Sequence, residues 1–357
     1  MSEEHPAGQR AGQSVPSAGG IPVGHTGRHS ATEAVDPRPG ETVPPSPGLR
    51  LMAVHAHPDD ESSKGAAMMA AYVDAGAEVM VVTCTGGEAG DLLNPLYEDT
   101  VACDRDITAV RREEMAEARE ALGVEHEWLG FHDSGLPEGD PVPELPANCF
   151  AQTPLETAAA PLVSLIRRFR PHVLISYDEV GGYPHPDHVM AHKATVEAYR
   201  AAGRAEVYPE AGEPWEVSKL YYDRAFNPAK YRTLHEAFTA AGEDSPFAER
   251  LGWYEKMDRL REVRARQSAG EDVPDPEDAP AWIIPDHAVT TQIPVAEHLE
   301  RRDAALRAHR TQVDPTGFFF AARNELLREA WPWEDYVLVD SRVEVELPEY
   351  DLFNGIR

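Results

Sequence analysis

Cysteine is scarce in this chain, whose 357 residues include only Cys84, Cys103 and Cys149. Three cysteines, odd in number and far apart in the sequence, predict neither a disulfide framework nor a four-cysteine metal site. The shortage is typical of a reducing compartment, and we therefore expect a cytoplasmic protein.

Long apolar runs and positive charge are also in short supply. No stretch approaches the roughly 20 apolar residues of a membrane-spanning helix, and residues 1–48 contain no apolar signal-peptide core. The 33 lysines and arginines stand against 62 acidic residues, which gives a formal net charge of −29. Nucleic acids and anionic membranes attract basic surfaces, so we expect neither as a partner.

Large apolar residues are few in residues 1–48, which are rich in Gly, Pro, Ser and His. Such a segment buries too little surface to offset the entropy lost on ordering, and we predict a disordered N-terminal extension. The remainder of the chain is predicted to form one domain, with a core at residues 50–230 and a C-terminal elaboration at 231–357. With 42% apolar residues overall, the chain is long enough for a substantial packed core.

From residue 50 onward, patterns of buried strands and amphipathic helices alternate. Strands are predicted at residues 51–54, 79–85, 128–131, 173–177 and 219–226, and helices at 62–74, 105–122, 155–169, 188–202, 250–268 and 298–312. This alternation predicts an α/β fold with a Rossmann-like, mostly parallel sheet and helices on both faces. The acidic stretch 242–280 is predicted to be an insertion or a lid, and the C-terminal elaboration to pack on the same sheet.

Two polar clusters follow two of the predicted strands. His57-Pro58-Asp59-Asp60 comes directly after the first strand, and Gly181 to His188 (GGYPHPDH) follows the strand at 173–177. Open α/β sheets bind their ligands at the carboxyl ends of the strands. We therefore expect the two clusters to meet at one edge of the sheet, although more than a hundred residues separate them.

The combined clusters offer the ligands of a catalytic metal. Two imidazoles and one carboxylate suit a divalent ion that keeps positions open for water and substrate, as catalytic zinc sites do. His57 and Asp60 are three residues apart at a helix entrance, so both can face one point. His188 can supply the third ligand from the other loop. The same donors also suit Fe²⁺.

Neighbours of these three residues suggest the reaction. Asp59 lies next to the metal ligands and can take a proton from the attacking water. Either His185 or Tyr183 could stabilise a tetrahedral oxyanion or protonate a leaving amine. The predicted chemistry is metal-assisted hydrolysis of an amide. Asp187 is expected to orient a ligand histidine, and His55, inside the strand, to be a core residue or to support a ligand.

His57-Pro58-Asp59-Asp60-Glu61, together with His185-Pro186-Asp187-His188, resembles the zinc-dependent N-acetylglucosaminyl-phosphatidylinositol deacetylases, also called the LmbE-like family. The resemblance implies a Rossmann-like sheet and removal of an acyl group from an amino sugar. It also implies one zinc ion on His57, Asp60 and His188, with Asp59 as the general base. His185 would stabilise the oxyanion or act as the acid, with Tyr183 beside it.

Four further positions match substrate-binding residues of the family. Arg111, at the start of an RxxEM stretch, and Asp133, before Ser-Gly, match residues that hold the sugar hydroxyls. Glu88, in a Gly-Gly-Glu turn, matches a contact on the inositol side. Lys64 matches a lysine that marks one branch of the family. Without the resemblance, Lys64 and Arg111 would be assigned to solvated helix faces.

Longer stretches resemble the branch of the family that cleaves the glucosamine–N-acetylcysteine amide of mycothiol S-conjugates. These are VHAHPDDESSKGAA, EHEWLGFHDSGLPEGD, YDEVGGYPHPDH and the terminal LFNGIR. The resemblance implies a small thiol-sugar conjugate as substrate and a role in detoxification, with a mercapturic acid and glucosaminyl-inositol as products. The alternatives are the N-acetylglucosaminyl-inositol deacetylase of mycothiol synthesis and a non-catalytic metal- or sugar-binding relative. A two-metal phosphoesterase would need more ligands than the two clusters offer.

Overall fold

The computed structural model describes residues 42–139 and 142–357, so most of the predicted extension at 1–48 lies outside the described residues. The part of it that is described packs on the domain. Val43 and Ser46 are only 8% and 0% exposed, and the guanidinium of Arg357 donates a hydrogen bond to the Ser46 hydroxyl at 2.9 Å. The packed domain therefore begins several residues before the predicted boundary.

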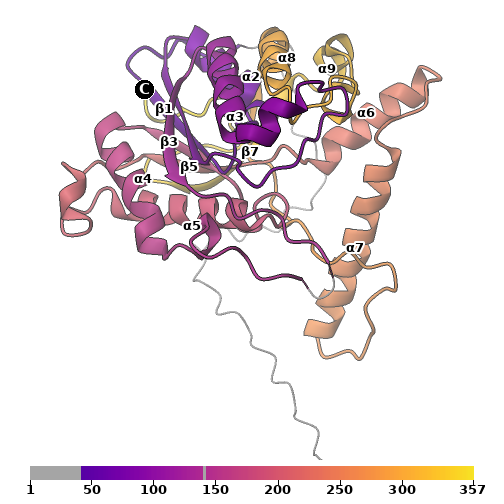
Figure 1. The fold of residues 1–357 in the computed structure, drawn as a ribbon. Helices are drawn as coiled ribbons and strands as arrows, with labels where there is room; N and C mark the ends of the chain where they lie inside the picture. The colour runs from indigo at the N-terminus through magenta and orange to yellow at the C-terminus, as the bar shows by residue number, and fades with distance from the viewer. Residues whose placement is uncertain (1–41, 140–141) are drawn as a thin grey trace, which may run out of the picture.

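A seven-stranded sheet in the order β3-β2-β1-β4-β5-β7-β6 forms the centre of the molecule (Figure 1). The strands β1 to β5 are parallel, and β7 runs antiparallel to both β5 and β6. The strands are β1 (Arg50–His55), β2 (Glu78–Thr85), β3 (Glu125–Phe131), β4 (Val173–Ser176), β5 (Lys219–Asp223), β6 (Thr291–Pro294) and β7 (Trp333–Ser341). The predicted mostly parallel α/β sheet is confirmed, and the C-terminal part adds two antiparallel strands to it.

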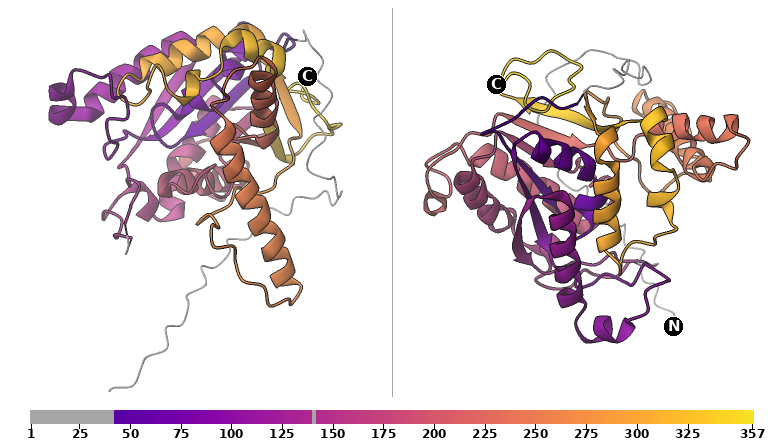
Figure 2. Two further views of the ribbon diagram at one scale, coloured as in Figure 1. Left: turned by 90° about the vertical axis from the view of Figure 1, so that its right-hand side faces the viewer. Right: turned by 90° about the horizontal axis from the view of Figure 1, so that it is seen from above.

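Helices cover both faces of the sheet (Figures 1 and 2). One face carries α2 (Ala66–Asp74), α3 (Thr100–Leu122), α8 (Leu299–Ala308) and α9 (Asn324–Ala330), and the other carries α4 (Leu155–Phe169) and α5 (Pro186–Ala201). The short α1 (Asp60–Ser63) follows β1, and α6 (Pro228–Ala240) and α7 (Ala248–Ser268) follow β5. Figure 1 shows α7 projecting away from the body of the domain. Within the described ranges, no helix is long and apolar enough to cross a membrane.

The alternating side chains of β1 supply two separate apolar cores. Leu51 and Ala53 pack in the core under α2, α3 and α8, whereas Met52 and Val54 pack in the core under α4 and α5. All four are at most 2% exposed. A strand that is buried on both faces has no polar alternation, and this is why the sequence shows near-continuous apolar runs at the parallel strands.

The predicted helix at 62–74 is wrong in one respect, because it is broken into α1 and α2. Lys64 is extended and Gly65 adopts a left-handed backbone with φ of 95°. Glycine adopts this conformation without steric cost, and a Cβ on Gly65 would lie 3.1 Å from the hydroxyl of Tyr336. The break turns the Lys64 ammonium back onto Asp60, 2.5 Å away.

The predicted helix at 298–312 is also too long, since α8 ends at Ala308. The turn that follows bonds to a distant loop, where the carbonyl of Thr311 accepts the amides of Leu93 and Asn94 at 3.0 and 3.1 Å. Neither α6 nor the antiparallel strands β6 and β7 were predicted. The predicted insertion at 242–280 consists largely of α7 and the loop after it.

The strand order places the two polar clusters side by side. Strands β1, β2 and β3 follow one another toward one edge of the sheet, while β4 and β5 lie on the other side of β1. Ligands of open α/β sheets bind where the strand order reverses in this way. The cluster at 57–60 follows β1 and the cluster at 181–188 follows β4, so both lie at this switch point.

Candidate metal centre and active site

His57, Asp60 and His188 come together in the interior, at the switch point. Oδ2 of Asp60 lies 3.5 Å from Nδ1 of His57 and 3.4 Å from Nε2 of His188. Ligand atoms bound tetrahedrally to zinc, at bond lengths of about 2.0–2.1 Å, would be roughly 3.3–3.4 Å apart. The two separations from the Asp60 oxygen are those of neighbouring ligands of one ion, but this trio is not among the groups of described residues whose donor atoms all lie within 4.8 Å of one another.

The His188 ring is oriented as metal-binding histidines are. Its Nδ1 lies 2.9 Å from the carbonyl oxygen of Gly181, to which it donates, so Nε2 is left with a lone pair. That nitrogen is buried and has no hydrogen-bond partner among the described residues, and a metal ion would satisfy it. Gly181 has φ of +79°, and a Cβ there would lie 2.5 Å from Cβ of His188, so no larger residue fits.

The other nitrogen of His57 faces two carboxylates. Its Nε2 lies 3.3 Å from Asp187 Oδ2 and 3.6 Å from Asp133 Oδ1. Asp187 is held in turn by the amide of Ser134 at 2.8 Å and by the hydroxyl of the same residue. Burial lowers the pKa of His57, but hydrogen bonds with Asp133, Asp187 and Asp60 outweigh burial and raise the pKa well above its ordinary value. Negative charge is thus concentrated around His57.

Asp60 is tied to the protein through both carboxylate oxygens. The hydroxyl of Tyr177 donates to Oδ2 at 2.7 Å, and the ammonium of Lys64 donates to Oδ1 at 2.5 Å. Burial alone would raise the pKa of Asp60, but the charges of Lys64 and His188 outweigh it and lower the pKa well below the ordinary value. No role was predicted for Tyr177; its place at the carboxyl end of the predicted strand 173–177 is the signal that could have found it.

Two other sets of donor atoms also converge near His57. In one set, His57, His185 and His188 each place a ring nitrogen within 4.8 Å of the others. In the second, His57 is joined by Asp133 and Asp187. Both of these carboxylates already accept backbone amides, from Gly135 and Ser134 respectively, which suits them better to orienting His57 than to binding an ion.

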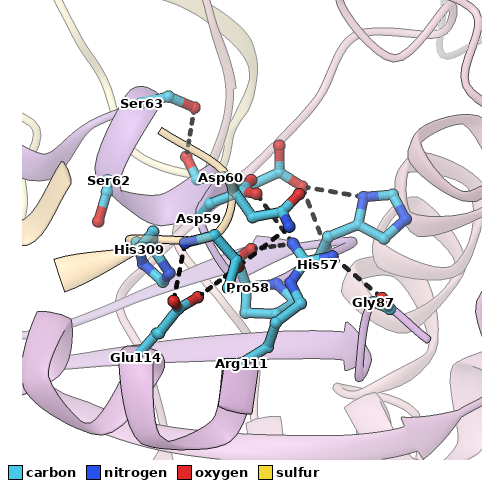
Figure 3. Close-up of polar contacts among 12 residues, drawn as sticks. His57, Pro58, Asp59, Asp60, Ser62, Ser63, Gly87, Arg111, Glu114 and His309 are labelled. Atoms are coloured by element: carbon cyan, nitrogen blue, oxygen red, sulfur yellow. Dashed lines mark hydrogen bonds and ion pairs between the residues drawn. The ribbon is translucent and has the colours of Figure 1, made fainter. Parts of the chain in front are cut away.

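Asp59 points away from this cluster and toward α3 (Figure 3). Its backbone is left-handed, with φ of 111°. Its Oδ2 accepts a hydrogen bond of 2.9 Å from the guanidinium of Arg111, and the carboxylate is a quarter exposed. Burial raises the pKa of Asp59, and the positive charge of Arg111 opposes this. A partly exposed carboxylate with a raised pKa is suited to exchanging a proton.

A buried pair, Glu61 and His309, supports the loop of Asp59; His309 is labelled in Figure 3. The backbone amide of Asp59 donates to Glu61 Oε2 at 3.0 Å, and His309 Nε2 lies 2.6 Å from Glu61 Oε1. Burial raises the pKa of Glu61, but the charge and hydrogen bond of His309 outweigh it and lower the pKa to about 2. His309 was not predicted to belong to the site, because it lies 248 positions away from Glu61 in a pattern typical of an ordinary helix.

His185 and Tyr183 lie against the same histidines. Nδ1 of His185 accepts the amide of Asp187 at 3.2 Å, which places the proton of the neutral ring on Nε2. Burial and the charges of His57 and His188 lower the pKa of His185 to about 3. The Tyr183 ring centroid lies 4.6 Å from that of His188, and its hydroxyl makes no hydrogen bond to another described residue. A neutral N–H and a phenol are therefore both available as donors.

The predicted sugar-binding residues contact the catalytic cluster itself. Arg111, 2% exposed, donates to the carbonyls of Pro58 at 2.6 Å and Gly87 at 3.1 Å. Asp133 accepts the amide of Ala89 at 3.2 Å, and Glu88 accepts the amide of Asp133 at 3.0 Å. Together with the Lys64–Asp60 pair, these contacts join the predicted substrate-binding residues to the metal cluster in one network.

Comparison with known proteins gives consistent matches. The family model for GlcNAc-PI de-N-acetylase matches residues 52–199. Mycothiol S-conjugate amidase of Streptomyces coelicolor is 49% identical over 311 residues, which cover 87% of this chain and 98% of that protein. The 1D-myo-inositol 2-acetamido-2-deoxy-alpha-D-glucopyranoside deacetylase of Geodermatophilus obscurus is 38% identical over 318 residues, covering 87% and 99%. Among solved structures, one match is a conserved protein from Thermus thermophilus, and the alignment covers 83% of this chain and 97% of that protein. The TM-score is 0.49 and the sequence identity is 20%, and neither value supports an inference about function.

Proposed function

Because this chain belongs to the GlcNAc-PI de-N-acetylase family of hydrolases, we propose that it is the metal-dependent amidase that hydrolyses the glucosamine–N-acetylcysteine amide of mycothiol S-conjugates. The products are a mercapturic acid and glucosaminyl-inositol. The observation that carries the proposal is the 49% identity, along 98% of its length, to the Streptomyces coelicolor amidase. We further propose one hydrolase domain over residues 49–357 and a cytoplasmic location.

His57, Asp60 and His188 are the ligands in this proposal, because the Asp60 oxygen lies 3.5 and 3.4 Å from the two histidine nitrogens, as neighbouring ligands would, and His188 presents an unpartnered nitrogen. Zinc is the proposed ion, with Fe²⁺ as the alternative for the same donors. Such an ion lowers the pKa of water and polarises an amide carbonyl. The set in which His185 replaces Asp60 is less suited, since the Asp60 carboxylate is held ionised by Lys64.

The protein's own groups perform the remaining steps. Asp59, directed by Arg111, accepts a proton from the attacking water. His185 donates its Nε2 hydrogen to the oxyanion that forms on the former carbonyl, and the free hydroxyl of Tyr183 is a second donor. Protonated Asp59 or Tyr183 then delivers a proton to the leaving amine.

The substrate contacts are proposed from the same network. Glu88 and Asp133, after β2 and β3, lie on the sugar and inositol side, and Arg111 reaches the same loops from α3. Lys64 is 6% exposed and bonded to Asp60, so its proposed substrate contact is made from within the site. A small, neutral thiol-sugar conjugate is compatible with a chain whose net charge is −29.

The second candidate is the sister deacetylase activity, favoured by the 38% identity to the Geodermatophilus obscurus enzyme. Purified, zinc-loaded protein should be assayed with the bimane conjugate of mycothiol and with N-acetylglucosaminyl-inositol. We expect kcat/KM to favour the conjugate at least about tenfold, a difference of roughly 1.4 kcal/mol in transition-state stabilisation. A preference for the acetylated sugar would reverse the assignment, and turnover of neither would favour a binding protein.

A further inference from the structure

A cavity lies beyond the carboxyl end of β5, on the face covered by α8 and α9. About 100 Å³ of its volume is accessible to the centre of a water molecule, and the cavity is partly open to solvent. The walls come almost entirely from residues 223–336, outside the 52–199 matched by the family model. Phe318 and Phe319 line it, and at 37% and 39% exposed they place its rim at the surface. A group can therefore enter from outside.

The cavity begins one side chain away from the metal centre. Ser63 lines it, and the Ser63 hydroxyl accepts a hydrogen bond of 3.2 Å from Lys64, whose ammonium also donates to Asp60. Phe226 lines it as well, and its ring lies 3.8 Å from the Cβ position of Gly182, in the loop that precedes α5 and its proposed ligand His188. Ser63 and Phe226 therefore connect the cavity to the two polar clusters, whose own residues do not line it.

The walls combine aromatic rings with the cations of Arg224, Lys230 and Arg302 and the carboxylates of Asp223, Glu334 and Asp335. Tyr231, Phe247, Trp331, Trp333 and Tyr336 line the cavity in addition to the phenylalanines named above. The guanidinium of Arg250 lies 4.5 Å from the ring centroid of Phe318 and 5.1 Å from that of Phe226. The ammonium of Lys230, also in the wall, makes no ion pair or hydrogen bond with a described residue. Such a wall suits an aromatic or apolar group that carries hydrogen-bond acceptors.

The sheet order gives the direction of the substrate. The sugar-side residues Glu88 and Asp133 follow β2 and β3, on one side of β1, whereas the cavity follows β5 on the other side. With the scissile amide at the switch point between β1 and β4, the acyl half must extend toward β5. In a mycothiol conjugate the sulfur is three bonds from the amide carbon, so its substituent leaves the site on this side.

We propose that this cavity binds the S-substituent of the conjugate and favours bulky aromatic or apolar groups over small ones. The inference rests on the proposed amidase function, but the ligand class can be measured without turnover. The zinc-loaded enzyme would be titrated with the fluorescent mercapturate N-acetyl-S-bimane-cysteine and, in competition, with N-acetyl-S-methylcysteine.

Three substitutions in one segment make the test specific. Phe318→Ala removes a wall and Ala322→Phe fills the cavity, because both residues line it. Phe320→Ala is the matched control, since the Phe320 ring is paired with the guanidinium of Arg307 at 4.1 Å and is not part of the wall. We expect the first two to weaken bimane-mercapturate binding about tenfold, the scale of one lost aromatic contact or a blocked pocket, and the control to change it less than about twofold.

The outcomes of this experiment test the ligand class of the cavity separately from the proposed amidase function. Equal affinity of the wild type for the bimane and methyl mercapturates, or equal effects of Phe318→Ala, Ala322→Phe and Phe320→Ala, would overturn the cavity assignment. Thermal unfolding of each variant, and its turnover of S-methyl mycothiol, would show that the fold and the metal centre are intact. If the wild type hydrolysed N-acetylglucosaminyl-inositol but no conjugate, while the binding pattern held, the amidase function would fail and the ligand class of the cavity would stand.

Discussion

Asp59 and Asp60 are adjacent in the sequence, yet their carboxylates lie in different surroundings. Asp60 contacts His57, His188 and Lys64 within 3.5 Å, whereas Asp59 contacts Arg111. The left-handed backbone of Asp59, with φ of 111°, turns the two side chains apart. Backbone strain of this kind is held only where the surroundings over-determine it, and it is concentrated at functional sites.

This separation predicts different losses for Asp59→Asn and Asp60→Asn. The first should keep its metal and lose about 10²–10⁴-fold in kcat, the usual contribution of general base catalysis. The second should lose most of its metal, because a ligand is gone. Metal content by mass spectrometry and kcat on the same samples would check both. A metal-depleted Asp59→Asn would contradict the division of roles between the two aspartates, and a fully loaded Asp60→Asn beside a depleted His185→Ala would point to the set of His57, His185 and His188.

His309 is a positioning residue for Asp59 in the same geometry, since it reaches Asp59 only through Glu61. His309→Ala should lower kcat about tenfold while KM and metal content change little, because misplacing a base slows the reaction without weakening binding. His309→Gln, which can still donate to Glu61, should recover part of the rate.

The matched control for His309 is His298→Ala. His298 forms a similar imidazole–carboxylate pair with Asp74 at 3.1 Å, on the surface and away from the site. His298→Ala should therefore leave kcat unchanged. A rise in KM or a loss of metal in His309→Ala, or no recovery of kcat in His309→Gln, would contradict the positioning role and leave His309 with a purely structural role in the core.

Site residues with a characteristic type and spacing could be predicted from the sequence. Site residues that reach the site only through the folding of distant segments could not. His57, Asp60 and His188 stand in two short motifs after two strands, and the structure brings them together. Tyr177 and His309 join the same site through hydrogen bonds across 117 and 248 positions. The pairing partners are not encoded locally, so neither residue was assigned, although the place of Tyr177 at the end of a predicted strand was a usable signal.

At the scale of elements, the break between α1 and α2 is what presents Lys64 to Asp60. Gly65→Ala should destabilise the protein by about 1–3 kcal/mol, since the new Cβ would force a strained left-handed backbone and approach the Tyr336 hydroxyl at 3.1 Å. Gly252→Ala is the control: it lies inside α7 with no atom within 4 Å of the added Cβ.

The control substitution should be neutral or stabilise the protein by about 0.5–1 kcal/mol, because alanine is the better helix former. Urea unfolding of both variants gives the comparison. Equal stability of Gly65→Ala and wild type would show that the turn after α1 tolerates a side chain and is not held by its backbone geometry.

Strands with apolar side chains on both faces could be predicted from the sequence, whereas a strand whose acidic side chains accept hydrogen bonds inside the protein could not. Strands β1, β2 and β4 are apolar on both sides and were easily recognised. In β7, acidic residues interrupt the pattern, although Asp335 is buried and Glu334 is half-buried. Glu334 accepts the amide of Met68 at the start of α2 at 2.9 Å, and Asp335 accepts hydrogen bonds from Asn227 and Gln292, each at 2.8 Å. Acids that serve as buried caps look like loop residues in a sequence, so β7 and its neighbour were missed.

At the scale of the whole molecule, the metal is expected to contribute to stability. Three carboxylates, those of Asp60, Asp133 and Asp187, are gathered around the buried histidines His57 and His188. A bound cation stabilises the native state by about 4 kcal/mol at a concentration one thousand times its Kd. Chelation should therefore lower Tm by several degrees, and added zinc should restore it.

Calorimetry of wild type and His188→Ala, each with chelator and with zinc, would check this expectation. The variant lacks a proposed ligand, so its Tm should respond much less to zinc than that of the wild type. An equal response would mean that the stabilising ion binds elsewhere on the molecule.

The reversal of strand order at β1 and β4 has a consequence for how such an enzyme diversifies. The loops after β2 and β3 belong to one stretch of chain, and the segment after β5 belongs to another. Mutations in the segment after β5 do not change the loops after β2 and β3, and they do not change the two polar clusters at the switch point. A duplicated gene could therefore acquire a new acyl preference by drift in one half alone, while inheriting its carbohydrate recognition and its catalytic residues intact.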